Sequence, residues 1–520
     1  MTRRVAAPDR SPLHNVGRWT QQRACIGPRD LALVDADRSL DYRALHERTG
    51  RCAALLAARG VGRGDRVAIL LGNRTAYLEL VFAAARIGAI AVPINARLTA
   101  PEISRLLADC TPRLLFHEPR LAEVAAASLA ALAEPPELID GDAAYEAALA
   151  THDPREAIEP VSPEDPMILM YTSGTTGIPK GALLPHRKTL YNSLNASLFF
   201  GLRADDRVLV ILPLFHSFGL AILSLPTLFT GGAVFLEPRF DAARAWQRVA
   251  DHHITFLGGV PTQLAALLEA LEAATPPPDT GTLRFLFGAG AAVPLEQIRA
   301  YEARGLVLKQ GFGQTETSIL CCLGATDAVR KAGSVGRPVF HAEVRVVKKD
   351  TLEAPTEDWV DAGVGEPGEI VVRGPITMLG YWNRPDDTAA TLRGEWLRTG
   401  DLATRDDEGF ITLVGRARDM YISGGENVYP AEVEAVFSGH PDVLDIAVVG
   451  VPDERWGEAG RAYVVLREGV ALDADALHAW GAEQLAPFKR PREFEAIAFL
   501  PRTETGKVQK HLLAETAASD

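Results

Sequence analysis

The sequence has few cysteines, and their arrangement argues against metal binding. The five residues, Cys25, Cys52, Cys110, Cys321 and Cys322, include no Cys-x-x-Cys pair and no Cys/His cluster at zinc-like spacing. They are also an odd number, so a fully paired disulfide framework is not indicated. We therefore expect reduced, buried thiols in a cytosolic protein.

An excess of positive charge is also missing. The chain has 54 Lys and Arg against 67 Asp and Glu, which gives a formal net charge of −13. Nonspecific nucleic-acid binding depends on a net basic surface that contacts phosphates. We therefore expect no nucleic-acid partner, and an anionic ligand would have to meet local positive groups.

The sequence shows neither a secretory signal nor a simple membrane span. No apolar run precedes Pro28, so we expect a cytoplasmic location. Residues 208–229 are almost wholly apolar and long enough to cross a bilayer, but prolines and a histidine interrupt them. We interpret them as buried strand, loop and helix pieces, with peripheral membrane contact as the alternative and no transmembrane segment.

The order of apolar runs in the first part of the chain predicts an α/β protein. A chain of 520 residues corresponds to roughly three to four domain-sized units. Strand-like runs alternate with Ala/Leu-rich helical stretches such as 77–87. The strand-like runs are 67–71, 91–94, 114–116, 255–260 and 283–288. This alternation predicts two α/β layers with parallel sheets.

The pattern changes in the last third of the chain. Between 333 and 414, short strands are separated by Gly, Pro and Asp turns, which predicts a small β-rich subdomain. After 415, we expect a separate α+β unit of about a hundred residues. Its expected elements are helices at 430–437 and 473–485 and strands at 446–449 and 462–466.

Residues 171–181 (YTSGTTGIPKG) have the composition of a phosphate-binding loop. They hold three glycines, four Ser or Thr hydroxyl side chains and Lys180 directly after an apolar run at 167–170. Glycines let backbone N–H groups approach phosphate oxygens, hydroxyl groups donate, and lysine supplies charge. The spacing of a Walker-A loop is absent, so we expect a nucleotide loop of another kind. The alternative is an ordinary surface turn.

The loop resembles the signature of the adenylate-forming superfamily, which includes acyl-CoA synthetases, luciferases and adenylation domains of peptide synthetases. Four further segments resemble that family in its order. They are 311–316 (GFGQTE), 381–385 (YWNRP) leading to 398–401 (RTGD), 415–419 (GRARD) running into 423–430 (SGGENVYP), and 501–507 (PRTETGK). The resemblance covers nearly the whole chain, and we expect an acyl-CoA synthetase of this superfamily.

The resemblance implies a particular domain organisation. It assigns 1–414 to an N-terminal AMP-binding domain, 415–419 to a hinge, and 420–520 to a mobile C-terminal domain. Arg418 falls at the hinge position, where the family more often has lysine or aspartate. Rotation about this hinge would let one C-terminal domain serve two half-reactions.

The resemblance also implies ATP, Mg²⁺ and coenzyme A as reactants or cofactors, and it assigns residues to each. Glu316 would be the magnesium ligand, and Asp401 with Arg416 would bind the ribose. Phe312 would stack on adenine beside a wall at 288–292, where the family's Gly-Gly-Ala-Pro reads AGAA. The residues that would contact nucleotide or CoA are Thr172, Ser173, Gly174, Thr176, Gly177, Lys180, Gly290, Ala291, Gly311, Phe312, Gly313, Gln314, Thr315, Asp401, Arg416, Ser423, Gly424 and Gly425.

Four residues are expected to act in catalysis. Lys507 would contact the carboxylate and α-phosphate oxygens and stabilise charge in the adenylation transition state. Thr175 and Glu316 would act at the phosphates, and His216 would gate the acyl and thiol tunnels. Without the family match, each of these residues would more often be a solvated or structural group.

The expected acid substrate is inferred from the absence of charged residues in one segment. No Asp, Glu, Lys or Arg occurs from 208 to 236, which in the family supplies part of the acyl pocket. Because burying a second carboxylate without a cation is costly, we expect an apolar acyl tail. A medium- or long-chain fatty acid is the first choice, and an aromatic or alicyclic acid the second. A carrier-protein acyl-AMP ligase, a luciferase-like oxygenase and a noncatalytic binder remain alternatives, and a homo-oligomer is compatible with the sequence.

Overall fold

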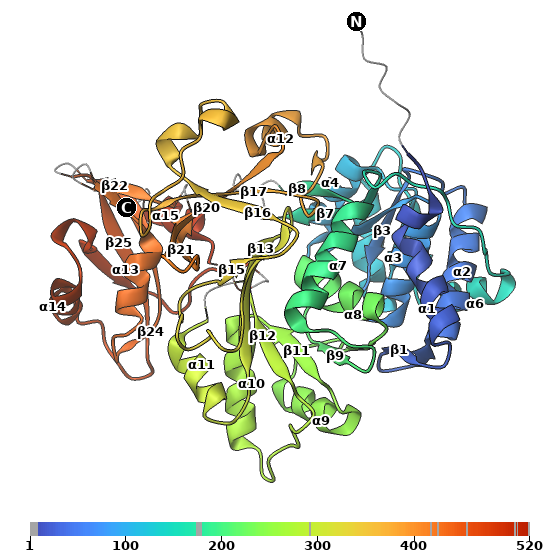
Figure 1. The fold of residues 1–520 in the computed structure, drawn as a ribbon, viewed down its shortest axis with the longest axis horizontal. Coiled ribbons are helices and arrows are strands. Elements are labelled where there is room, and N and C mark those ends of the chain that lie inside the picture. The colour runs from blue at the N-terminus through green and yellow to red at the C-terminus, as the bar shows by residue number, and fades with distance from the viewer. Residues whose placement is uncertain are drawn as a thin grey trace, which may run out of the picture.

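The computed structural model describes residues 9–172, 179–290, 293–416, 419–423, 426–453, 456–503, 506 and 508–517. Within these ranges the strands form four sheets. Figure 1 shows the first N-terminal elements at one end of the molecule and the C-terminal elements, α13 (Pro430–Phe437) to α15 (Lys510–Ala517), at the other. The remaining elements lie between these two ends.

The first sheet has seven strands, in the order β18-β8-β7-β4-β3-β5-β6. The strands from β7 to β6 run parallel, whereas β7, β8 and β18 pair antiparallel. The bounds are β3 (Arg66–Leu70), β4 (Ile90–Pro93), β5 (Leu114–His117), β6 (Glu137–Asp140), β7 (Pro166–Thr172), β8 (Lys180–Pro185) and β18 (Gly380–Tyr381).

The second sheet has nine strands, in the order β15-β14-β13-β12-β11-β9-β10-β1-β2. Its centre, from β13 to β1, is parallel, and both edges are antiparallel. The bounds are β1 (Leu31–Val34), β2 (Ser39–Asp41), β9 (Arg207–Val210), β10 (Ala233–Leu236), β11 (Phe256–Gly259), β12 (Phe285–Gly288), β13 (Leu308–Gln314), β14 (Ser318–Leu323) and β15 (Arg337–Pro338).

These two sheets share one hydrophobic core. Successive strand residues point to opposite faces, so Val67 of β3 and Val208 of β9 enter the shared core, while Ala68 and Leu209 face outward cores. Helix α3 (Thr75–Arg86) belongs to the shared core, and every one of its residues is buried. The predicted α/β architecture of two sheets with helices is therefore confirmed.

Helices pack in the core shared by the two sheets and against the outer face of each sheet. The shared core also contains residues of α1, α2, α6, α7 and α8, whereas α4 and α5 cover the first sheet and α9 to α11 cover the second. Their bounds are α1 (Trp19–Ile26), α2 (Tyr42–Ala58), α4 (Ala100–Cys110), α5 (Ala122–Leu129), α6 (Ala143–Thr151), α7 (His186–Phe200), α8 (Leu225–Thr230), α9 (Ala242–His252), α10 (Pro261–Ala273) and α11 (Leu295–Glu302).

The expectation of parallel sheets was incomplete, because both sheets end in antiparallel hairpins. Strands β7 and β8 flank the predicted phosphate loop, and β13 and β14 flank the turn that carries Glu316. A parallel connection needs a long crossover, whereas antiparallel neighbours can be joined by a short turn. Two of the predicted nucleotide segments are therefore hairpin connections at sheet edges.

The apolar segment 208–229 folds as strand, loop and helix pieces. It comprises most of β9, a loop with His216, the π-helical η4 (Phe218–Ser224) and most of α8. Among the described residues, no helix is both long and apolar enough to cross a bilayer. The interpretation of this segment as buried pieces is confirmed.

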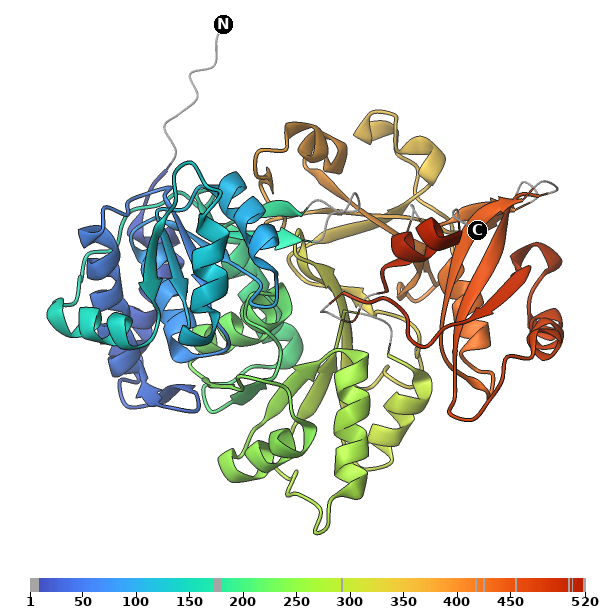
Figure 2. The ribbon, with the colours of Figure 1, turned by 180° about the vertical axis from the view of Figure 1, so that it is seen from behind.

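The predicted β-rich region is an antiparallel sheet. Its strands are β16 (Glu343–Val347), β17 (Gly368–Arg373), β19 (Leu392–Arg393), β20 (Trp396–Arg405) and β21 (Ile411–Arg416), and α12 (Pro385–Thr391) lies beside it. In Figure 2 this yellow and orange region lies between the blue elements and the red C-terminal elements.

The C-terminal residues form a small α+β unit with the predicted elements. Helix α13 has the expected bounds, and α14 (Ala474–Gln484) falls within the second expected helix. The sheet contains β22 (Tyr421–Ser423), β23 (Glu426–Val428), β24 (Val443–Asp453), β25 (Gly457–Leu466) and β26 (Glu493–Ala496). Both expected strands are present but longer, because β24 and β25 pair as one long hairpin.

The cysteines are free thiols, and the expectation that all are buried was wrong for one of them. Cys52, Cys110 and Cys321 are buried and Cys322 is partly buried, but Cys25 is exposed. Helix α1 buries only residues of its first turn, Trp19 and Thr20, so its last turn projects toward solvent.

Candidate active site

The β7–β8 hairpin fixes both ends of the predicted phosphate loop. Thr172 and Lys180 are paired across the hairpin, and the Thr172 hydroxyl donates to the carbonyl oxygen of Lys180 at 3.3 Å. The two predicted residues on the strands are therefore neighbours. The predicted residues between them, Ser173, Gly174, Thr175, Thr176 and Gly177, lie outside the described residues.

The Lys180 side chain lies against residues from a distant part of the chain. Its ammonium pairs with the Asp387 carboxylate of α12 and lies 5.6 Å from the centre of the Tyr381 ring. Tyr381 is brought there because β18 pairs with β8, with Tyr381 opposite Ala182. The sequence motif 381–385 thus contributes Tyr381 to the surroundings of the lysine.

The β13–β14 turn explains why its motif contains two glycines. A Cβ on Gly311 would lie 2.6 Å from Cζ of Phe287, and one on Gly313 would lie 1.9 Å from the carbonyl oxygen of Ser318. Either contact would force the backbone apart. These glycines are needed for close packing of the turn that presents Gln314, Thr315 and Glu316.

Glu316 is held by a tyrosine that sequence reasoning did not single out. The Tyr381 hydroxyl donates to Oε1 of Glu316 at 2.8 Å, and the backbone N–H of Met378 donates to the Glu316 carbonyl oxygen at 2.8 Å. Burial, together with the Glu316 carboxylate, raises the pKa of Tyr381, so its hydroxyl stays protonated and donates. The sequence contained the tyrosine within a motif but not its partner.

A buried lysine also faces this turn and was missed from the sequence. Lys188 of α7 is buried, and its ammonium donates to the Ser318 hydroxyl, two residues after Glu316. Burial lowers the pKa of Lys188 to about 7, although the charge of Glu316 opposes that shift. No sequence signal would have identified it, because a lysine near a helix start is usually solvated.

Gln314, Asp401 and Arg416 come together from three strands. The Gln314 amide nitrogen donates to the Thr399 carbonyl oxygen at 2.8 Å and to the Asp401 carboxylate. Arg416 lies opposite Asp401 across the β20–β21 pair, with 3.1 Å between its Nε and Oδ1 of Asp401. Asp401 is buried, and its carboxylate is held by Gln314 and Arg416.

Four further predicted residues, His216, Phe312, Thr315 and Gly290, lie in the part of the chain before residue 415. His216 and Phe312 are partly buried, and Phe312 packs against the shared core. The backbone N–H of Phe218 donates to Nδ1 of His216 at 3.3 Å, which orients the imidazole at the start of η4. Thr315 is buried in the turn, and Gly290 has a φ of 91° that favours glycine. Ala291 lies outside the described residues.

The C-terminal segment approaches the body beside the predicted adenine wall. A Cβ on Gly506 would lie 3.9 Å from Cγ2 of Val260, and one on Gly290 would lie 3.3 Å from Cγ1 of the same valine. Gly506 and Gly290 therefore flank one side chain at the start of α10. Lys507, like Gly424, Gly425 and the predicted hinge residue Arg418, lies outside the described residues, whereas Ser423 is buried on β22.

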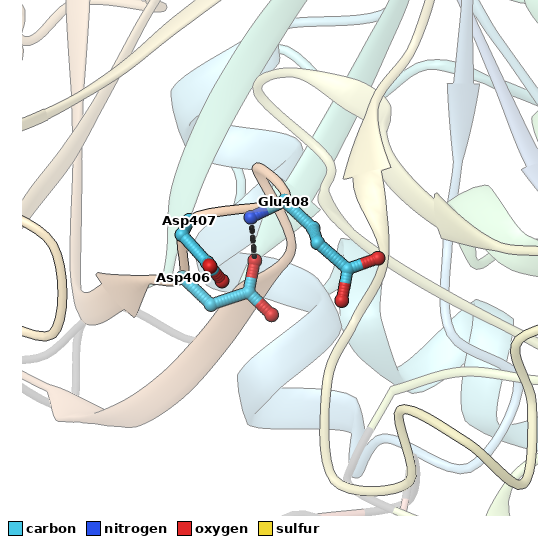
Figure 3. Close-up of side chains that lie close together, drawn as sticks. All are labelled: Asp406, Asp407 and Glu408. Atoms are coloured by element: carbon cyan, nitrogen blue, oxygen red, sulfur yellow. Dashed lines mark hydrogen bonds between the residues drawn. The ribbon is translucent and has the colours of Figure 1, made fainter.

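One acidic cluster in the described part of the chain has oxygen atoms close enough to hold a metal ion, but two of its three carboxylates are paired with cationic side chains. Asp406, Asp407 and Glu408 lie in the β20–β21 turn, as Figure 3 shows. Lys331 lies 2.6 Å from Asp406 and 2.5 Å from Glu408, and Arg330 lies 2.7 Å from Glu408. The cluster is an ion-pair network that joins this turn to residues 327–331.

Comparison with known proteins identifies the family. The family model described as AMP-binding enzyme matches residues 20–382, and the one described as AMP-binding enzyme C-terminal domain matches 432–507. The chain belongs to the AMP-binding enzymes. It is an acyl-CoA synthetase of the adenylate-forming superfamily, an AMP-forming acid–thiol ligase, which confirms the resemblance seen in the motifs.

Individual relatives match over nearly their whole length. The chain is 42% identical to a feruloyl-CoA synthase of an Amycolatopsis species, covering 95% of this chain and 97% of the relative. It is 39% identical to an indoleacetate–CoA ligase of Aromatoleum aromaticum, covering 95% and 96%. The crystal structure of ATP-bound MatB from Rhodopseudomonas palustris superposes with a TM-score of 0.89 at 32% identity, covering 97% and 98%.

Proposed function

We propose that this AMP-binding enzyme converts an aromatic carboxylic acid into its CoA thioester. The carboxylate attacks the α-phosphorus of ATP, the bond to pyrophosphate breaks, and an acyl-AMP forms. The thiol of CoA then attacks the acyl carbon, loses its proton to solvent, and AMP leaves. The convergence of Glu316, Gln314, Asp401 and Arg416 beside the two hairpins is the observation that supports this function.

Different residues bind different parts of ATP during adenylation. Gln314 fixes the Asp401 carboxylate, which with Arg416 offers hydrogen-bond partners for the ribose hydroxyls. Lys180 and the hydroxyl groups of the β7–β8 connection bind and orient the β- and γ-phosphates. Lys507 neutralises the negative charge that grows on the α-phosphate oxygens in the transition state.

Glu316 is suited to hold Mg²⁺. Its carboxylate supplies the hard oxygen donors that Mg²⁺ prefers, and the Tyr381 hydroxyl on Oε1 fixes its orientation. When bound, the ion would neutralise charge on the phosphate oxygens. Mg²⁺ usually takes one or two carboxylates with substrate phosphates, so a single glutamate fits this role.

The proposed aromatic acid replaces the fatty acid that the sequence placed first among the candidate substrates. The names of the relatives at 42% and 39% identity state feruloyl and indoleacetate, both aromatic acyl groups. A fatty acid remains the second candidate, because the charge-free residues 208–236 are mostly buried and apolar. A cytoplasmic location, a homo-oligomer, peripheral membrane contact and the choice of CoA over a carrier protein stay predictions.

The decisive experiment is a panel of acids assayed with ATP, Mg²⁺ and CoA, with the product mass determined. The panel should contain hydroxycinnamic acids, arylacetic acids and saturated fatty acids of graded length. We expect the highest kcat/KM with an aromatic acid and a product with the mass of its CoA thioester. A fatty acid with the highest kcat/KM would overturn the substrate assignment. Absence of acid-dependent pyrophosphate release throughout the panel would overturn the ligase function in this chain.

A further inference from the structure

The Lys180–Asp387 ion pair is formed at the edge of the predicted phosphate loop. Lys180 is the first residue of β8, directly after that connection, and its side chain is 17% exposed. The Asp387 side chain is 34% exposed. Because both groups are partly shielded from water, their interaction is screened less than that of a fully exposed pair.

The fold holds Asp387 in this position through a chain of backbone contacts. Strand β18 pairs with β8, and the Trp382 N–H donates to the Gly181 carbonyl oxygen at 2.7 Å. The Thr388 hydroxyl accepts the Tyr381 N–H at 2.9 Å, which ties the first turn of α12 to β18. Asp387 therefore faces Lys180 because two paired strands and a short helix are joined there.

A carboxylate at this place opposes the binding of a triphosphate. Lys180 can give its full charge to phosphate oxygens only if it leaves Asp387 or shares its protons with both. If the pair stays intact, the negative charge of Asp387 still lowers the positive potential that attracts the nucleotide. In both cases ATP binding is weaker than it would be with a neutral residue at this position.

We propose that Asp387 is the internal competitor of ATP for Lys180 and thereby sets the affinity of the site for ATP and pyrophosphate. This inference rests on the proposed function, which assigns Lys180 to the phosphates. It also gives the carboxylate a use, because weaker binding of the phosphates favours the departure of pyrophosphate after adenylation. Asp387 is thus an affinity-determining residue and takes no part in bond formation.

The test measures ATP binding to the full-length protein by calorimetry, with Mg²⁺ and without acid or CoA. Asp387→Asn preserves the shape of the side chain and removes its charge. Asp386→Asn is the matched control, because Asp386 is an exposed acid on the same helix. We expect Asp387→Asn to lower the Kd for ATP and for pyrophosphate by roughly threefold to tenfold, and Asp386→Asn to change it less than about twofold.

A Lys180 variant tests whether the effect of Asp387 on ATP affinity depends on Lys180. Lys180→Met should weaken ATP binding, and adding Asp387→Asn to it should give little further change. Equal effects of the two aspartate substitutions, weaker binding by Asp387→Asn, or an undiminished gain in the Lys180→Met background would each overturn the proposal. Failure of the ligase function would look different, because ATP would still bind while no acid in the panel released pyrophosphate. Unchanged thermal melting of each variant would show that it remains folded.

Discussion

The body of the molecule and the C-terminal unit differ in how they are held together. Among the described residues, the hydrophobic clusters of the body extend no further than Leu413, and those of the C-terminal unit begin at Tyr421. No cluster of described residues contains side chains from both sides of the segment 415–419. The proposed rotation of one unit relative to the other would therefore break no hydrophobic cluster of the described residues.

The same two units differ in what they bring to the site. In the body, the Glu316 and Asp401 carboxylates are fixed by Tyr381, Gln314 and Arg416. The C-terminal unit reaches the body at Gly506, which lies beside Val260. This difference is consistent with our proposal of a preassembled nucleotide half and a C-terminal half that is delivered to it by rotation at the hinge.

Removing the ammonium group of Lys507 should have the largest effect on activity. We expect Lys507→Ala to slow adenylation about 100- to 1000-fold, because charge on the α-phosphate loses its partner. Thioester formation from supplied acyl-AMP should be nearly unchanged. Acid-dependent pyrophosphate release and single-turnover thioester formation measure the two steps. Lys510→Ala, whose lysine pairs with Glu434 inside the C-terminal unit at 2.6 Å, is the control. Equal loss of both steps would contradict the division of labour.

The pH dependence of the stability of the body should depend on a buried neutral histidine, His186. Burial lowers the pKa of His186 to about 3 from its ordinary 6.5, and its Nδ1 accepts the Val16 N–H at 3.2 Å. The unfolded chain therefore takes up a proton first as pH falls, and stability is lost from about pH 6.5 towards 3. Asparagine can keep the acceptor without titrating.

We expect wild type to lose about 2 to 3 kcal/mol more than His186→Asn between pH 6.5 and 4.5. Urea midpoints at the two pH values would show this as a larger shift for wild type. The exposed His478→Asn, in the C-terminal unit, should leave the shift unchanged. Identical shifts for wild type and His186→Asn would disprove the role of this histidine.

Stiffening the proposed hinge should reverse the pattern expected for Lys507→Ala. Proline fixes φ, so Arg418→Pro restricts the backbone at the proposed pivot. We expect thioester formation to slow about tenfold, an effect of the size of a conformational step becoming limiting, while adenylation is largely spared. Arg418→Ala leaves φ free and is the control. Normal turnover of the proline variant would remove Arg418 as the pivot.

Removing the hydrogen bond between Tyr381 and Glu316 should have the smallest effect on activity. Tyr381→Phe removes the hydrogen bond to Glu316, which is worth about 1 kcal/mol, so kcat for adenylation should fall about fivefold. In a Glu316→Gln background the same change should add little, because the two residues act together. Additive losses would show that Tyr381 does not act through Glu316.

Local sequence patterns predicted the fold class and several individual elements. The runs at 67–71, 91–94 and 114–116 correspond to β3, β4 and β5, and helix α13 has the expected bounds. These predictions succeed because periodicity and turn residues are properties of neighbouring positions. The antiparallel edges were not predicted, since strand direction depends on the connection that the tertiary structure allows.

The motifs identified the members of the site but not their partners. The sequence by itself determined the chemical types and their order, a glycine-rich loop, Glu316, Asp401 and a late lysine, and these were enough to indicate the family. The tertiary structure alone decided that Tyr381 holds Glu316, that Asp387 faces Lys180, and that Lys188 is buried behind Ser318. These contacts join residues 65, 207 and 130 positions apart, so they depend on sheet order and register, which no local pattern specifies.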